Sequence, residues 1–231
     1  MSRFINAIRT LVYPASCIMC GNLNSELCLD CNSIWRNSSK NFRLANHIVA
    51  AGLTYNERVA RVVLSAKEDN GKFAKKCILL GLDAAYQNLR GSITIPASTF
   101  LISIPSANAA NRRRGGNYLF DLSKTFAKDS KKYLGNMLTV PKKPMLTQSP
   151  HVKDQSGLSA LEREFNMESA INVDLSYFDH LNLSKISVLL MDDVVTSGAT
   201  LKSAISALEA SKITVIGAIA ACASQRQMRI P

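Results

Sequence analysis

The sequence LLMDDVVTSGATLKSAISAL, residues 189–208, decides the fold expected for this chain. It continues an apolar run that begins at Ile186, typical of a strand covered on both faces of a sheet. Two acidic residues, Asp192 and Asp193, follow the run, and a turn of small residues extends from Thr196 to Thr200. The next helix has an apolar stripe formed by Leu201, Ala204, Ile205 and Leu208. This order predicts a ligand site at the carboxyl edge of an open α/β sheet.

The small-residue turn can hold a phosphate group. Successive N–H groups of a Gly/Ser/Thr turn at a helix N-terminus form an anion nest, and the helix dipole also favours negative charge there. The predicted phosphate ligands are Thr196, Ser197, Gly198, Ala199 and Thr200. Three of them have hydroxyls that can donate to phosphate oxygens, and the glycine lets the backbone approach closely.

The two carboxylates suit the sugar end of the same ligand. Asp192 and Asp193 would repel a phosphate but can accept hydrogen bonds from ribose hydroxyls, directly or around Mg²⁺. The alternative is an acidic turn in which Thr196 or Ser197 only caps the next helix. That alternative explains one hydroxyl and not the whole cluster. The motif resembles the signature of type I phosphoribosyltransferases, which bind 5-phosphoribosyl-1-pyrophosphate (PRPP). The resemblance implies that the turn holds the 5′-phosphate and that the two aspartates, as candidate catalytic residues, face the ribose.

Strands and helices are expected to alternate along the rest of the chain. We expect strands at 48–55, 100–104, 138–140 and 213–221, and helices at 57–67, 73–89 and 119–126. Alternation of this kind predicts an α/β fold with a mostly parallel sheet. The polar stretch 32–46 is expected to be a linker, and residues 141–157 a loop. We therefore predict an N-terminal module over 1–46 and a phosphoribosyltransferase-like domain over 47–231.

Four cysteines form two closely spaced pairs near the N-terminus, Cys17-x2-Cys20 and Cys28-x2-Cys31. Four thiolates in two such knuckles suit a tetrahedral Zn²⁺, and Gly21 suits the tight turn after the first pair. The alternatives are a redox dithiol or two disulfides. Because four thiolates leave no open coordination position, the predicted zinc is structural. Cys77 and Cys222 lie in apolar surroundings and are expected in the core.

The first residues resemble a lipoprotein signal that ends in Cys17, but Arg9 interrupts the apolar run. Phe4, Ile8 and Leu11 recur at helical spacing, which favours a short amphipathic helix. No apolar run approaches the roughly 18–20 residues that span a bilayer. We therefore expect a cytoplasmic protein without membrane insertion.

The chain is strongly basic. Its 28 Lys and Arg residues against 17 Asp and Glu give a formal net charge of +11. Such an excess favours polyanionic partners, such as nucleic acid or phosphorylated small molecules, although it also serves solubility. No aromatic residues are interleaved with the basic clusters as a stacking platform for single strands would require.

The order of these features resembles the ComF family, associated with DNA uptake in naturally competent bacteria. Besides the cysteine pairs and the phosphate turn, the resemblance includes Lys67 with Gly71 and the basic turn at Arg114-Gly115 with Asn117. Residues that match in order before the phosphate turn are Gln155, Leu158, Arg163 and Asn166. The resemblance implies that Lys67 and Arg114 belong to the ligand site. Lys153, Gln155 and Arg163 lie in a region that we expect to be flexible and able to close over the ligand.

The chain departs from the family around the basic turn, where Gly116 precedes Asn117 and Tyr118 follows it. Small residues at 106–108 stand where the related fold binds pyrophosphate. Arg112, Arg113 and Arg114 can pair with pyrophosphate or with a nucleic-acid backbone, and the alternative is a solvated basic turn. Three functions follow as hypotheses. They are a ComF-type accessory factor of DNA uptake that acts near single-stranded DNA and uptake proteins, an active phosphoribosyltransferase, and a PRPP-sensing regulator.

Overall fold

The computed structural model describes residues 15–23, 25–68, 71–106, 108–134, 138–148, 171–178 and 183–229. The helix expected within the first residues lies outside these ranges. So does the segment that contains Lys153, Gln155, Leu158, Arg163 and Asn166.

A five-stranded sheet forms the centre of the molecule, with the strand order β1-β2-β7-β6-β3. The strands are β1 (Lys40–Leu44), β2 (His47–Tyr55), β3 (Thr99–Ser103), β6 (Ser187–Val195) and β7 (Thr214–Ser224). All neighbours are parallel except the hairpin of β1 and β2. The predicted α/β fold with a mostly parallel sheet is therefore confirmed.

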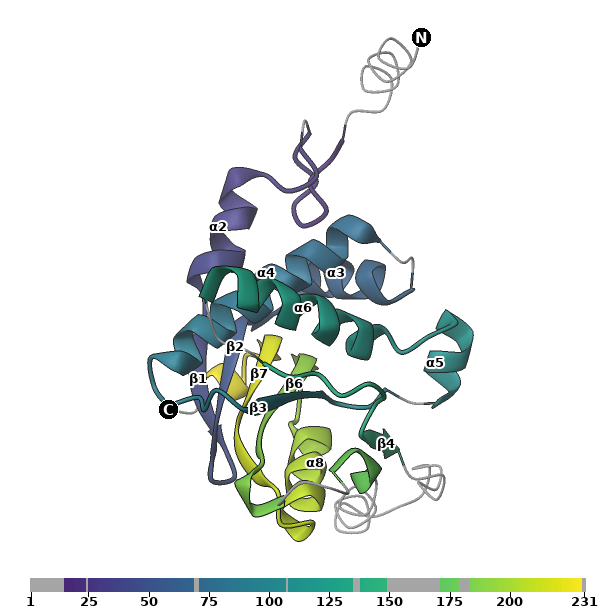
Figure 1. Ribbon diagram of the computed structural model, residues 1–231. Helices are drawn as coiled ribbons and strands as arrows, with labels where there is room; N and C mark the ends of the chain where they lie inside the picture. The colour runs from purple at the N-terminus through teal and green to yellow at the C-terminus, as the bar shows by residue number, and fades with distance from the viewer. Residues whose placement is uncertain are drawn as a thin grey trace, which may run out of the picture.

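Helices cover both faces of this sheet (Figure 1). On one face lie α3 (Glu57–Glu68), α4 (Lys72–Arg90) and α6 (Tyr118–Leu134), and on the other lies α8 (Ala199–Ala210). A two-stranded antiparallel sheet of β4 (Leu146–Gln148) and β5 (Ile171–Val173) stands beside α8. The shorter helices are α2 (Leu29–Asn37) and α5 (Asn108–Arg114), with 3-10 turns at Leu175–Phe178, Leu183–Lys185 and Gln227–Arg229.

The core lies on both faces of the sheet, with buried residues such as Leu82 of α4 and Leu208 of α8, as the apolar sequences of the central strands require. Side chains from Val188 to Met191 on β6 are fully buried, and both Cys77 and Cys222 belong to the core as predicted. Helix α4 approaches β2 through a pair of glycines. A methyl group on Gly52 would stand 2.6 Å from the Cα of Gly81, so a larger residue does not fit at position 52 unless α4 moves away.

The segment expected to be a linker, 32–46, was predicted wrongly. It contains most of α2 and the whole of β1, and β1 pairs with β2 as the edge strand of the main sheet. Phe42 and Leu44 alternate with more exposed polar residues, so β1 buries one face. On α2, the indole of Trp35 is fully buried near Gly81.

The basic turn was also predicted wrongly, because Arg112, Arg113 and Arg114 belong to helix α5. The turn begins only at Gly115, whose φ of 70° is left-handed. Asn117 then caps α6, accepting a hydrogen bond from the N–H of Phe120 at 3.2 Å. The strand expected at 138–140 is reduced to a single β-bridge, in which Thr139 pairs with Phe100 of β3.

Candidate functional site at the carboxyl edge of the sheet

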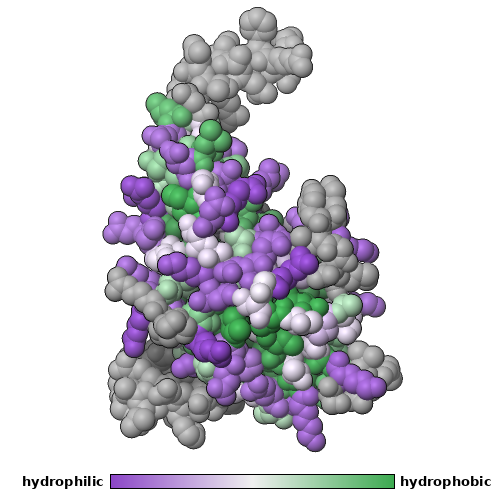
Figure 2. Space-filling model, turned by 90° about the vertical axis from the view of Figure 1, so that its left-hand side faces the viewer, coloured by the Kyte–Doolittle hydropathy of each residue, from purple (hydrophilic) through white to green (hydrophobic). Residues whose placement is uncertain are grey.

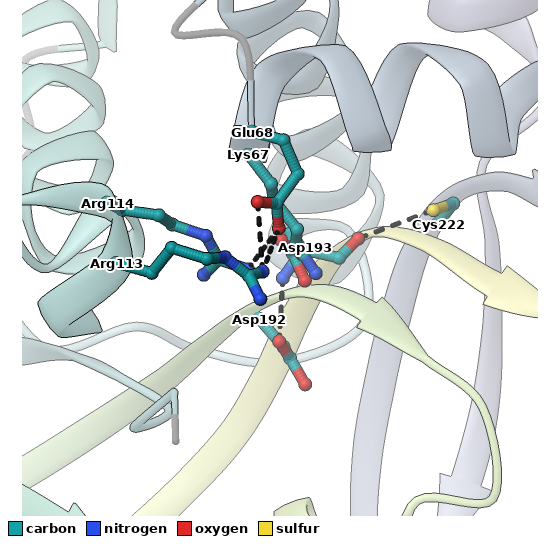
Figure 3. A network of polar contacts seen from close by, with 7 residues as sticks. All are labelled: Lys67, Glu68, Arg113, Arg114, Asp192, Asp193 and Cys222. Carbon is teal, nitrogen blue, oxygen red and sulfur yellow. Dashed lines mark hydrogen bonds and ion pairs between the residues drawn. The ribbon is translucent and has the colours of Figure 1, made fainter. Parts of the chain in front are cut away.

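Asp192 and Asp193 lie inside strand β6, whereas the sequence was interpreted as placing them after its end. The strand continues because β6 and β7 stay paired as far as Val195 and Ala223. Successive side chains of a strand point to opposite faces. The two carboxylates therefore point to opposite sides of the sheet, as Figure 3 shows, and do not form one parallel pair.

Asp193 points toward the face covered by α3 and is only 4% exposed. One of its carboxylate oxygens lies 2.8 Å from Nζ of Lys67, near the end of α3. The thiol of Cys222 donates to the Asp193 backbone carbonyl at 3.4 Å. A buried carboxylate needs such a counter-charge, because burial without one would cost several kcal/mol, on the order of the penalty for an unpaired ion.

Asp192 is half-buried, and its Oδ1 accepts a hydrogen bond from the N–H of Asp193 at 2.8 Å. Burial, and after it the adjacent charge of Asp193, raise the pKa of Asp192 to about 7, although Lys67 acts in the opposite direction. A carboxyl group with this pKa changes charge near neutral pH, so Asp192 can be either a hydrogen-bond donor or a ligand for a cation.

The predicted phosphate turn has the expected strand–turn–helix geometry. Gly198 has a left-handed φ of 78°, and α8 begins at the next residue. A Cβ on Gly198 would also stand 2.7 Å from Cδ1 of Leu44 on β1. Ser197 Oγ accepts from the N–H of Ala199 at 3.3 Å. In the described part of the chain no acceptor meets the N–H groups of Gly198, Thr200 and Leu201, which leaves these donors available to an anion.

Two residues near the end of the described chain hold this turn in place. Ser224 Oγ donates to the carbonyl of Thr196 at 2.8 Å, and Gln227 Nε2 donates to the carbonyl of Ser197 at 2.9 Å. Since these bonds fix the carbonyl groups, they orient the peptide units of the turn. No local sequence pattern indicates these contacts, because Ser224 and Gln227 reach the turn only through the pairing of β6 with β7.

A polar cavity of about 280 Å³ opens beside the turn. Five of the predicted site residues line this cavity: Lys67, Arg114, Asp192, Asp193 and Thr200. Ser106, at the end of the loop after β3, and Gln148 of β4 also line it. Thr196 and Ser197 are exposed and, like Gly198 and Ala199, are not part of the cavity wall. The cavity and the exposed half of the turn are therefore separate surfaces, and the assignment of both to one ligand site stays a prediction.

An acidic residue that the sequence analysis missed pairs with the arginines (Figure 3). Both carboxylate oxygens of Glu68 accept from Nη2 of Arg113 at 2.9 Å, and Oε1 also accepts from Nη2 of Arg114 at 2.8 Å. The hydrogen bond from Arg114 is the main cause that lowers the pKa of Glu68. Arg113 and Arg114 are thus paired with Glu68; the Arg114 side chain is 13% exposed, whereas that of Arg113 is 68% exposed.

The four predicted zinc ligands come together. The sulfur atoms of Cys17, Cys20, Cys28 and Cys31 all lie within 4.8 Å of one another. Between Cys20 and Cys28 the Sγ–Sγ distance is 3.7 Å, close to the roughly 3.8 Å expected in a tetrahedral site with Zn–S bonds of about 2.3 Å. All four are free thiols. The donor set therefore fits a zinc ion, and it indicates a zinc ribbon.

The backbone around these sulfurs supports a metal site. Gly21 has a left-handed φ of 83°, and its N–H donates to the Cys17 carbonyl at 2.8 Å, which closes the tight turn predicted there. Burial alone would raise the pKa of the Cys17 thiol, but N–H groups of Cys28, Cys20 and Met19 outweigh it and lower the pKa to about 6, whereas burial raises the pKa of Cys31. A thiolate, and not a thiol, is the form that binds zinc.

The surface near the cysteines carries exposed apolar side chains, those of Leu23 and Leu29. Figure 2 shows apolar surface at this end of the molecule and a larger apolar area below the middle of the same face. A groove of about 710 Å³ lies between α2, α4 and α6, away from the Asp192 cavity. No helix in the described part of the chain combines the length and the apolar character that crossing a bilayer requires.

Comparison with known proteins does not assign this site. No protein-family model matches the chain, and no curated protein matches it at a significant level. The functional interpretation therefore depends on the residues and on their geometry.

Proposed function

We propose that this chain is a ComF-like protein whose phosphoribosyltransferase-type domain binds PRPP, or a related phosphoribosyl ligand, together with Mg²⁺. In this proposal it acts in the cytoplasm as an accessory factor of DNA uptake, near incoming single-stranded DNA and the uptake proteins. The excess of 28 basic over 17 acidic residues supports a polyanionic partner.

One observation carries the ligand proposal. A left-handed Gly198 turn, whose N–H groups have no acceptor among the described residues, opens helix α8 immediately beside the cavity that contains Asp192, Asp193 and Lys67. This arrangement offers donors for a phosphate at one end and carboxylates for hydroxyl groups or a cation at the other. A phosphorylated ribose has these groups in the same order.

In the proposed complex the 5′-phosphate contacts the turn from Thr196 to Thr200. The ribose hydroxyls face Asp192, whose half-buried carboxylate remains free of an ion pair within the described chain. The pyrophosphate extends toward Lys67 and Arg114, the two cationic residues of the cavity wall. Mg²⁺ would be held by carboxylate and phosphate oxygens, which are the ligands it prefers.

Zinc has a structural role in this proposal. Cys28 directly precedes helix α2 and Cys31 lies within it, so the metal would fix the start of a helix that carries the buried Trp35. Since α2 packs against α4 of the main domain, the cluster would stabilise the whole N-terminal part of the fold.

Thermal unfolding with and without PRPP and Mg²⁺ tests the ligand proposal. A ligand that binds only the folded protein increases the free energy of unfolding, by about 2.7 kcal/mol when its concentration is a hundred times Kd. The melting temperature therefore rises with ligand concentration. We expect this increase in the wild-type chain and not in Asp192→Asn. No increase at millimolar PRPP in the zinc-loaded protein would contradict the proposal.

Two assays then separate the biological hypotheses. If the protein releases pyrophosphate from PRPP only when a nucleobase is added, it is an active phosphoribosyltransferase. The site would then accelerate the reaction by holding PRPP and the base in position. Saturable binding without release would favour an accessory or sensing role. In a competent host, Asp192→Asn should then reduce DNA uptake, and unchanged uptake would contradict the accessory role.

A further inference from the structure

The groove between α2, α4 and α6 lies away from the candidate phosphoribosyl site. Its volume of about 710 Å³ corresponds to roughly 24 water molecules at about 30 Å³ each. Half-buried apolar side chains form part of its wall, those of Leu27, Phe73, Leu79 and Leu80. Apolar surface that stays in water costs free energy, so a groove of this kind favours an occupant with an apolar face.

The groove also contains a buried hydroxyl group without a partner. Ser130 on α6 is 3% exposed, lines the groove, and forms no side-chain hydrogen bond within the described part of the chain. By contrast, Ser123 on the same helix is also buried, and its hydroxyl donates to the carbonyl of Phe120 at 2.7 Å. Buried polar groups in folded proteins nearly always have a partner, so the groove suits an occupant that brings polar atoms as well as apolar ones.

An exposed leucine extends the apolar surface toward the cysteine cluster. Leu29 directly follows Cys28 in the first turn of α2 and is 86% exposed. It precedes Asn32 by one helical turn and Arg36 by two, and both of these residues line the groove. The three side chains therefore share one face of α2, and the uncovered surface continues from the groove to Leu29.

The described chain begins beside this groove. Its first residue is Ala15, and the N–H of Ile18 donates to the carbonyl of Glu26 at 3.0 Å. Glu26 directly precedes Leu27 in the groove wall, and the three residues that lead to Ile18 span at most about 11 Å. The segment 1–14 is therefore connected to the described chain close to one end of the groove.

The N-terminal sequence has the pattern and the length that the groove requires. Phe4, Ile8 and Leu11 recur at helical spacing and would form one apolar face. The groove wall on α4 extends from Phe73 to Gln87, about 21 Å along the helix axis, which is also the length of a helix of fourteen residues. A helix over the first fourteen residues would therefore match this wall from end to end.

The charged residues at the rim allow a basic helix to dock. The segment 1–14 contains Arg3 and Arg9 and no acidic residue. Asp83 on α4 and Asp129 on α6 line the groove from two sides, so acidic partners stand on both edges. The groove also has two basic residues, Arg36 and Lys76. Ion pairs at an exposed rim with charges of both signs fix the orientation of a docked helix more than they add affinity.

We propose that the segment 1–14 docks as an amphipathic helix in this groove of its own chain, with Phe4, Ile8 and Leu11 against the apolar wall. The docked helix would join the start of the cysteine cluster to α4 and α6. The other long stretch outside the described ranges, 149–170, connects β4 to β5 beside α8, on the opposite face of the sheet (Figure 1). The proposal does not depend on the phosphoribosyl ligand.

Hydrogen exchange of the full chain, followed by mass spectrometry, tests the docking. A helix of this length is marginal in water by itself, so slow exchange of its amides requires a packing partner. We expect the amides of residues 4–12 to exchange at least about tenfold more slowly than in an unfolded chain. Ile8→Asp should abolish this protection, because it places a charge against the apolar wall. Its matched control, Thr10→Asp, adds the same charge about 200° around the helix and should keep the protection.

A second pair of variants changes the groove itself. Leu80→Asp should also abolish the protection of residues 4–12, because Leu80 belongs to the apolar wall. Leu64→Asp should keep it, since Leu64 is 57% exposed on α3 and does not line the groove. Circular dichroism checks that each variant is folded. If Leu80→Asp does not fold, the comparison of Ile8→Asp with Thr10→Asp decides alone.

Fast exchange of residues 4–12 in the wild type would overturn the proposal, and so would equal loss of protection in Ile8→Asp and Thr10→Asp. Protection that persists in folded Leu80→Asp would show that the helix packs elsewhere. If protection appears only at high protein concentration, a second copy of the chain supplies the helix, and docking within one chain is wrong. If it appears only with phosphatidylglycerol vesicles, the helix binds a lipid surface and not the groove.

Discussion

The Nζ atom of Lys67 lies 2.8 Å from a carboxylate oxygen of Asp193, and this ion pair joins the end of α3 to the central strand β6. The pair explains how an acidic residue can occupy a buried strand position. It also places a cation in the cavity beside the Gly198 turn, because Lys67 lines that cavity. One residue therefore contributes to stability and to the candidate ligand site.

Lys67→Met should destabilise the fold by about 2–3 kcal/mol, because it leaves the carboxylate of Asp193 buried without its counter-charge. The expected cost is below that of a fully buried pair, since the Lys67 side chain is 25% exposed. Urea unfolding followed by circular dichroism measures the change in the free energy of unfolding.

The matched control for Lys67→Met is the double variant with Asp193→Asn. If the cost comes from the unpaired charge, neutralising Asp193 should restore most of the lost stability, and the two substitutions will be strongly non-additive. Additive losses would show that Lys67 stabilises the fold through its packing.

The wild type should lose stability as pH rises because Asp192 must ionise, and Asp192→Asn should not show this loss. In the folded protein the pKa of Asp192 is about 7, above its ordinary value of 3.8. At a pH between these two values, Asp192 keeps a proton in the folded state that it releases in the unfolded state. The contribution of Asp192 to the free energy of unfolding therefore falls as pH rises from about 4 to 7, and it is constant above about 7. Relative to the wild type, the variant should therefore gain stability progressively from pH 4 to pH 7. A stability difference that does not change with pH would contradict this account.

Gly52→Ala should cost more than about 3 kcal/mol, because the new methyl group would meet the backbone of Gly81 and separate α4 from β2. Gly116→Ala is the control, since the nearest atom to its Cβ would be a side-chain oxygen of Asp121 at 3.8 Å. Thermal unfolding of the two variants compares them directly. Similar melting temperatures would mean that α4 can shift without loss.

Cys28→Ser should abolish stoichiometric zinc in the purified protein, measured by atomic emission, whereas Cys77→Ser should keep it because Cys77 lies in the core outside the cluster. Trp35 is the one tryptophan of the chain and is fully buried. Removal of zinc by a strong chelator should therefore shift its fluorescence to the red as α2 loosens. Zinc that persists in Cys28→Ser would contradict the four-cysteine site.

Much of the sheet was predictable from the sequence because its strands are apolar and lie in the interior. The run at 186–191 and the strand at 213–221 have no polar alternation to obscure them, and both correspond to central strands β6 and β7. Strand β1 was missed for the opposite reason. It is a five-residue edge strand in which only Phe42 and Leu44 are buried.

The candidate site was predictable where its residues are close in sequence and not where the fold brings them together. The turn at Gly198 and the four cysteines follow from local spacing. The contacts of Glu68 with Arg113 and Arg114 join residues 45 and 46 positions apart, and those of Gln227 with the turn depend on β7. The end of β6 was misplaced because acidic residues are uncommon in strands, and the partner that permits Asp193 lies on α3.

The central claim is that the Gly198 turn and the adjacent cavity bind a phosphoribosyl ligand, and calorimetric titration with PRPP in Mg²⁺ tests it most directly. The comparison is between the wild type, Gly198→Val, which cannot keep the left-handed turn, and Glu57→Gln, which lies away from the site. We predict saturable binding in the wild type and in Glu57→Gln, and none in folded Gly198→Val. Equal binding by Gly198→Val, or no binding by the zinc-loaded wild type, would contradict the account.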